Sequence, residues 1–101
     1  MNITAVKVRK LLSEGRLRAV VSVTLDDMLA VHDIKIVKGE ERLFVAMPSR
    51  KDESGVFRDI VHPISSGVRE LFEETILDAY RRELEIQASQ EADADIDEET
   101  T

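Results

Sequence analysis

The chain has 101 residues, of which 43% are hydrophobic and 35% charged, and its formal net charge is −7. This length corresponds to one domain, which buries only about 60–65% of the surface of its unfolded chain, so a partner subunit would help to stabilise it. The absence of cysteine excludes a disulfide framework and thiolate-based catalysis or metal binding. No apolar stretch approaches the roughly 20 residues of a membrane helix, and the N-terminus lacks a secretion-signal pattern. We therefore expect a cytoplasmic protein with no membrane contact.

The acidic charge is concentrated near the C-terminus. Residues 83–101 contain eight acidic side chains and no Lys or Arg, which leaves a net charge of about +1 on residues 1–82. A block of like charge is typical of a disordered segment that modulates interactions. We predict a folded domain over residues 1–85 and a disordered acidic tail over residues 86–101, which competes with phosphate for basic side chains.

Three β-strands are predicted in the first part of the chain, at residues 3–11, 16–25 and 29–37. Apolar and polar side chains alternate in all three, imperfectly in the first, as in strands buried on one face. Two short turn sequences, Ser13-Glu14-Gly15 and Asp26-Asp27, separate the segments. Strands joined by such short turns form an antiparallel meander.

Two further strands are predicted on either side of a polar loop. Residues 43–47 form a short apolar run that suits a buried strand, and residues 56–61 are rich in β-branched and aromatic side chains. The residues between them have turn chemistry, including Ser54-Gly55. This arrangement places Arg50 and Lys51 side by side at the tip of a hairpin.

The hydrophobic period then changes to that of a helix. Ser65 or Ser66 can cap its N-terminus, and the periodic signal fades beyond Ala88. The apolar stripe consists of Val68, Leu71, Phe72, Thr75, Ile76, Ala79 and Tyr80. The predicted fold class is therefore α+β: a small antiparallel sheet of about five strands, a C-terminal helix and an acidic tail.

No residue pattern supports catalysis. Histidine is the side chain that titrates near neutral pH, and the chain has only His32 and His62. His32 and its neighbour Asp33 point to opposite faces of a regular strand, so they cannot act as a base and its orienting carboxylate. The motifs of zinc proteases, P-loop proteins, dinucleotide-binding folds and serine hydrolases are absent. We expect no enzyme activity, cofactor, metal or small-molecule substrate.

Basic side chains form two candidate groups for nucleic-acid binding, because such groups neutralise phosphates and release counterions. The first group lies on the predicted outer faces of the first hairpin and consists of Lys7, Arg9, Arg16 and Arg18. The second belongs to the polar loop and the strand after it and consists of Arg50, Lys51 and Arg58. The alternative is a solvated sheet face whose like charges discourage edge pairing. Aromatic residues are too few for a platform that stacks single-stranded bases.

Three segments occur in an order and spacing that resemble the SpoVG family of stage V sporulation protein G and septation regulators. They are VHDIKI at residues 31–36, LFVAMPS at 43–49 and FRDIVHPI at 57–64, and the resemblance extends from about Asn2 to Tyr80. It implies a small antiparallel sheet with a C-terminal helix. It also implies a homodimer that binds DNA, and RNA in some members, and that influences septation, sporulation or related gene expression.

In this family, a basic pair directly after the Met-Pro-Ser segment is linked to DNA binding, and Arg50 and Lys51 occupy that place here. The order is Arg-Lys where Lys-Arg is common. Because Arg makes planar bidentate contacts and Lys acts as a point charge, the base preference is expected to shift. The alternative function is a protein-interaction module in cell-division regulation, in which the sheet edge or the helix docks a partner without nucleic acid.

Overall fold

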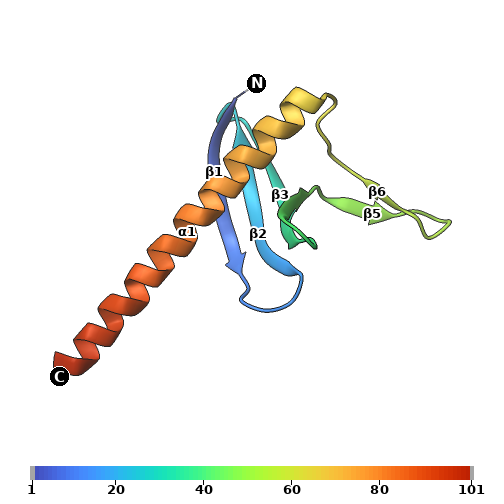
Figure 1. The fold of residues 1–101 in the computed structure, drawn as a ribbon. Helices are drawn as coiled ribbons and strands as arrows, with labels where there is room; N and C mark the ends of the chain where they lie inside the picture. Colours follow the sequence, from blue (N-terminus) through green and yellow to red (C-terminus); the bar gives the residue numbers. More distant parts are fainter. Residues whose placement is uncertain (1, 101) are drawn as a thin grey trace.

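The computed structural model describes the backbone of residues 2–100 and the side chains of residues 2–90. It contains a four-stranded antiparallel sheet, a separate two-stranded hairpin and one helix (Figure 1). The main sheet has the strand order β1 (Ile3–Leu11), β2 (Leu17–Leu25), β3 (Leu29–Lys38) and β4 (Leu43–Ala46). The hairpin consists of β5 (Ser49–Lys51) and β6 (Phe57–Asp59), and the helix is α1 (Ser66–Thr100). The predicted α+β class is confirmed.

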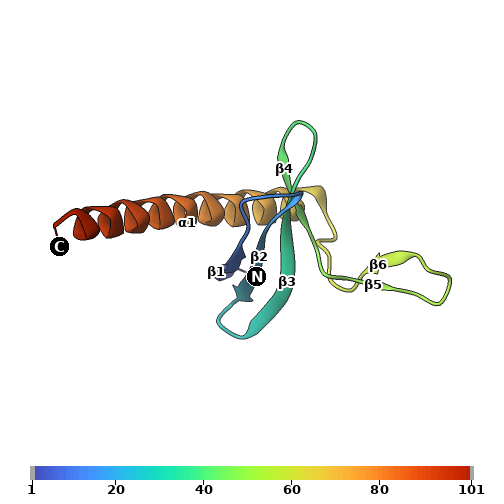
Figure 2. The ribbon, with the colours of Figure 1, turned by 90° about the horizontal axis from the view of Figure 1, so that it is seen from below.

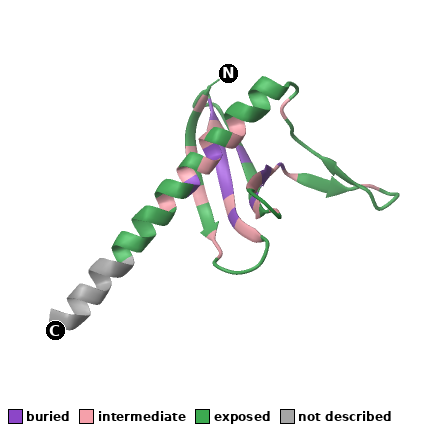
Figure 3. Ribbon diagram, in the orientation of Figure 1, coloured by how far each residue is buried: buried purple, intermediate pink, exposed green. Residues whose placement is uncertain are grey.

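The core lies between the main sheet and α1, which crosses one face of the sheet in contact with β1 and β4. β2 is paired on both sides, and its Val21 and Val23 are fully buried. Ile34 of β3 and Ile76 of α1 complete the centre of the core, each with no exposed surface. Buried residues are therefore most numerous in β2 and next in β3, and α1 covers them with Ile76 and Tyr80 (Figure 3).

The first turn of α1 agrees with the sequence. The backbone N–H of Val68 donates a hydrogen bond to Ser65 Oγ at 3.3 Å, so Ser65 is the N-cap. Among the described residues, no helix combines the length and the apolar character that crossing a membrane requires. The side chains of residues 91–101 lie outside the described residues, and the disordered tail at residues 86–101 stays a prediction.

The structure corrects the arrangement of the last two predicted strands. β4 pairs with β3, and the later strand does not pair with β4; it forms the separate hairpin with β5. Pro48 lies between β4 and β5, and a ladder stops at proline because it has no N–H to donate. Residues 49–59, which we call the arm, project away from the main sheet (Figures 1 and 2). The N–H of Ile60 donates to Pro48 O at 2.8 Å and closes the base of the arm.

A tight turn of three residues, Asp26 to Met28, joins β2 to β3. Asp26 and Asp27 have φ angles of 51° and 54°, in the left-handed region that a type I′ turn requires. The N–H of Met28 donates to Leu25 O at 2.9 Å across the turn. Asp26 also holds Asn2, since its Oδ1 accepts a hydrogen bond from the N–H of Asn2 at 2.8 Å.

Replacing Asp27 with glycine is expected to raise the free energy of unfolding by about 0.5–1 kcal/mol, because glycine adopts positive φ without a steric penalty. The hydrogen bond from the N–H of residue 27 to Thr4 Oγ1 survives the change. Urea denaturation measures the effect. Asp26→Gly is the matched control: it relieves the same strain but loses the bond to Asn2, so it should gain less. A lower urea midpoint for Asp27→Gly would contradict the prediction.

Candidate nucleic-acid interface

Asp52 organises the turn of the arm. Its Oδ1 accepts hydrogen bonds from Ser54 Oγ at 2.6 Å, from Ser54 N at 2.9 Å and from Val56 N at 3.1 Å. Its Oδ2 accepts one from Arg58 Nε at 2.7 Å, which also forms a salt bridge. The Ser54 hydroxyl first, and the Arg58 guanidinium next, lower the pKa of Asp52 to about 2. The carboxylate is therefore ionised and holds the turn at neutral pH.

The backbone N–H resonance of Val56 is expected to report the titration of Asp52, because the carboxylate accepts its hydrogen bond. The pKa of Asp52 lies below its ordinary value of 3.8, so its bonds contribute fully above that pH and are lost as the pH falls through about 2. NMR spectra of the wild type should show a Val56 transition near pH 2, which Asp52→Asn should remove and Glu53→Gln should keep. A midpoint near 3.8 would show that these bonds do not form.

The arm carries charges of both signs. Its basic side chains are Arg50, Lys51 and Arg58, and its acidic side chains are Asp52, Glu53 and Asp59. Arg58 is paired with Asp52, whereas Arg50 and Lys51 are exposed and form no salt bridge with any side chain of residues 2–90. These two are therefore the arm's available cations for a phosphate.

Arg50 and Lys51 lie in β5 and not at the tip of the hairpin, which corrects the sequence-based placement. Adjacent residues of a strand point to opposite faces, so the two cations serve different faces of the arm. Arg50 is opposite Arg58 on one face. On the other face Lys51 is opposite Phe57, and its Nζ lies 5.7 Å from the ring centroid, within the range of a cation–π interaction.

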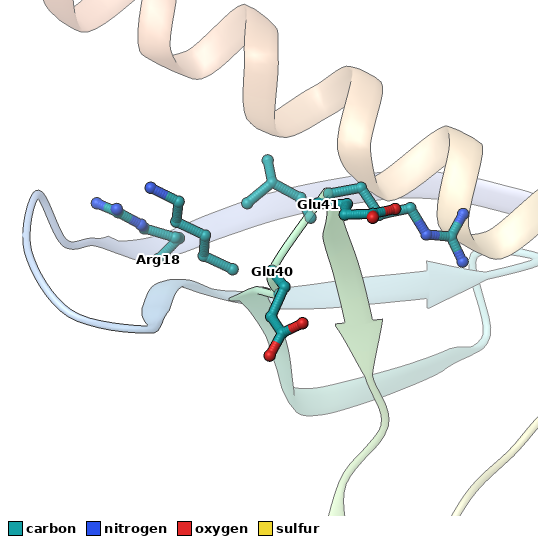
Figure 4. Close-up of a pocket in the computed structure, with 7 residues that line it drawn as sticks. Arg18, Glu40 and Glu41 are labelled. Atoms are coloured by element: carbon teal, nitrogen blue, oxygen red, sulfur yellow. The ribbon is translucent and has the colours of Figure 1, made fainter.

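The structure does not bring the four basic residues of the first hairpin into one patch. Arg16 lies in the turn before β2 begins. Arg18 Nη1 donates to Ser13 O at 2.8 Å, and its side chain borders a hollow of about 340 Å³ at the β3–β4 turn. Glu40 and Glu41 line the same hollow, so charges of both signs meet there (Figure 4).

Lys7 and Arg9 lie together on the face of the sheet that α1 leaves open. Lys7 is opposite Ser22, and Arg9 Nε donates to Ser22 Oγ at 3.3 Å. The same hydroxyl lies 2.8 Å from His32 Nδ1. Residue pattern alone connected neither Ser22 nor His32 with this basic group, because the register of β1, β2 and β3 decides which side chains meet. The available signal for Arg9 was the imperfect alternation of residues 3–11, where the pairing of β1 with β2 is irregular. In the part of the chain whose side chains are described, no cluster of His, Cys, Asp or Glu is placed to hold a metal ion.

Comparison with known proteins gives a consistent result. The family model described as SpoVG matches residues 1–82. The chain is 54% identical over 82 residues to a septation protein SpoVG of Lachnospira eligens, which covers 81% of this chain and 93% of the relative. It is 50% identical over 91 residues to the protein of that name from Caldanaerobacter subterraneus, covering 90% and 100% of the two chains. The chain is also 50% identical over 84 residues to the protein of that name from Clostridioides difficile, and the match covers 83% of this chain and 91% of the relative. These names refer to septation and not to an enzyme.

Proposed function

Because the chain belongs to the SpoVG family, we propose that it is a cytoplasmic nucleic-acid-binding regulator of septation or related gene expression that acts as a homodimer. Exposed Arg50 and Lys51 carry this proposal, since neither forms a salt bridge with a described side chain. They also follow the Met-Pro-Ser segment, the position at which the family resemblance links a basic pair to DNA binding. Such cations favour binding because they release counterions from the phosphates.

Large exposed apolar side chains between β6 and the first turns of α1 support the homodimer. Phe57 in β6 is 67% exposed, and Ile60 and Ile64, on the segment between β6 and α1, are 64% and 92% exposed. Val68 and Leu71 in the first turns of α1 are 42% and 50% exposed. Exposed apolar residues gathered in one region of a small protein mark an interaction surface. A second copy related by a two-fold axis would cover the region with the same surface and give a self-complementary interface.

The experiment that tests the proposal measures fluorescence anisotropy of a labelled DNA duplex, and of an RNA of the same sequence, at several salt concentrations. The logarithm of the binding constant should fall linearly with the logarithm of the salt concentration. Light scattering on the same sample should give about twice the chain mass of 11.4 kDa. Absence of salt-dependent binding to either nucleic acid would overturn the proposed activity, and the mass of a single chain would overturn the dimer.

The second candidate function is a protein-interaction module in cell-division regulation. The same exposed apolar side chains between β6 and the first turns of α1 favour it, because a partner protein covers such residues as well as a second copy does. Docking of this kind depends weakly on salt, whereas phosphate binding depends on it steeply. Salt-insensitive association with a division protein, together with no binding to nucleic acid, would favour this second function.

A further inference from the structure

The strands of the main sheet have a different charge balance from the arm. The arm has as many carboxylates as basic side chains. In β1 to β4 the only acidic residue is Asp33, which is exposed at an irregularity of β3 with a φ of 61°. The basic residues of the same strands are Lys7, Arg9, Lys10, Arg18, Lys35 and Lys38. The sheet is therefore the more cationic part of the molecule.

The strand register places three of these lysines on the face that α1 leaves open. Val20 and Ser22 alternate with the core valines of β2, so they point away from the helix. Lys10 and Lys35 flank Val20 on the two neighbouring strands, and Lys7 is opposite Ser22. Because adjacent strands lie about 4.8 Å apart, the backbones of Lys10 and Lys35 are about 10 Å apart across β2.

An irregularity in β1 adds Arg9 to this face. The pairing shifts between Val8 and Lys10, which makes Arg9 the extra residue of a β-bulge. Ser22 is only 6% exposed although no helix covers this face, and its hydroxyl contacts both Arg9 Nε and His32 Nδ1. The Ser22 hydroxyl thus holds the side chains of Arg9 and His32 against the sheet and restricts their rotamers before any ligand binds.

Among the side chains of residues 2–90, these cations have no carboxylate partner. The salt bridges among residues 2–90 are Arg58–Asp52 in the arm and Arg81–Asp78 on α1. Lys7, Lys10 and Lys35 are each exposed in a strand. Val20 and Ser22 lie between these lysines, and their short side chains protrude little from the sheet. An extended polyanion can therefore reach the lysines from the solvent side.

We propose that the open face of the main sheet, formed by Lys7, Arg9, Lys10 and Lys35 around Ser22, is a second phosphate-binding surface that takes a nucleic-acid backbone independently of the arm. The inference rests on the proposed function for the identity of the polyanion. The arm projects away from this sheet (Figures 1 and 2). One protomer therefore contacts nucleic acid at two separate places, and the sheet contributes affinity through phosphates and not through base recognition.

The test is the double variant Lys10→Ala with Lys35→Ala in the full chain, measured by anisotropy on a DNA duplex of about 20 base pairs across several salt concentrations. If each lysine makes one phosphate contact, the proposed dimer loses four, which should flatten the logarithmic salt slope by about 3.6 and weaken binding at least tenfold near physiological salt. Arg81→Ala with Arg82→Ala is the matched control. It removes the same charge from α1, outside the open face, and should leave the slope unchanged. Thermal melts of both variants check that the sheet is intact.

A second measurement combines the Lys10→Ala and Lys35→Ala variant with Arg50→Ala and Lys51→Ala. Two independent surfaces predict that the changes in slope add. An unchanged slope for the sheet variant, or a combined loss smaller than the sum, overturns the second surface. The proposed function fails separately, if the wild type shows no salt-dependent binding at all. A loss of binding caused by the sheet variant alone would support the inference and remove the arm from the interface.

Discussion

Replacement of both Arg50 and Lys51 by alanine should weaken binding to a DNA duplex at least tenfold, which corresponds to about 1.4 kcal/mol or more. A dimer presents two arms, and if each pair makes about two contacts the dimer makes about four. Losing them should flatten the logarithmic salt slope by about 3 to 4 units. The free energy of unfolding should change by no more than about 0.5 kcal/mol, because both side chains are exposed.

The single variants make this prediction sharper. Because Arg50 and Lys51 point to opposite faces of the arm, each alone should remove part of the salt slope, and the two parts should add. Glu53→Ala is the control in the same turn: it removes a negative charge and should not weaken binding. Anisotropy across several salt concentrations measures the four variants and the wild type. A double variant that binds as the wild type does would exclude the arm from the interface.

Replacement of Ile76 by alanine should lower the free energy of unfolding by about 2–5 kcal/mol. Ile76 is fully buried where α1 meets the sheet, so its truncation loses apolar burial and leaves a cavity. A small domain has a total stability of about 5–15 kcal/mol, and this one change removes a large share of it. Urea denaturation followed by circular dichroism measures the loss.

Ile86→Ala is the matched control for this second prediction, because it is the same substitution in the same helix. Ile86 is 49% exposed and lies outside the core, so its truncation should cost well under 1 kcal/mol. The difference between the two variants isolates the contact of α1 with the sheet from the helix propensity that both share. Equal losses would mean that Ile76 does not anchor the helix.

The sequence predicted the elements that depend on local pattern. Alternation located the first three strands, and Asp26-Asp27 marked a turn whose two residues both have positive φ. Ser65 and the apolar stripe after it indicated the start of the helix. These features were predictable because neighbouring residues determine them: the period of apolar side chains, the turn and the cap.

The pairing partners were not predictable in the same way. Pro48 has no N–H to donate and therefore ends a ladder, but only the structure shows that the chain leaves the main sheet there and starts a second one. The irregular pairing at Arg9 and the positive φ of Asp33 likewise depend on the neighbouring strand. Candidate binding residues could therefore be chosen from their charge, whereas the faces they occupy required the strand register.

The separation of the arm from the main sheet has a consequence for how such a protein diversifies. No residue of the arm belongs to the buried cluster that holds the sheet and α1 together, and Pro48 marks the boundary between the two. Substitutions between residues 49 and 59 therefore remove nothing from this core, although they would alter the element to which the proposed function assigns nucleic-acid binding. Because substitutions in the arm leave this core intact, they can be selected for their effect on the specificity of the proposed binding. The sequence of the arm can therefore vary while the core of the main sheet and α1 stays the same.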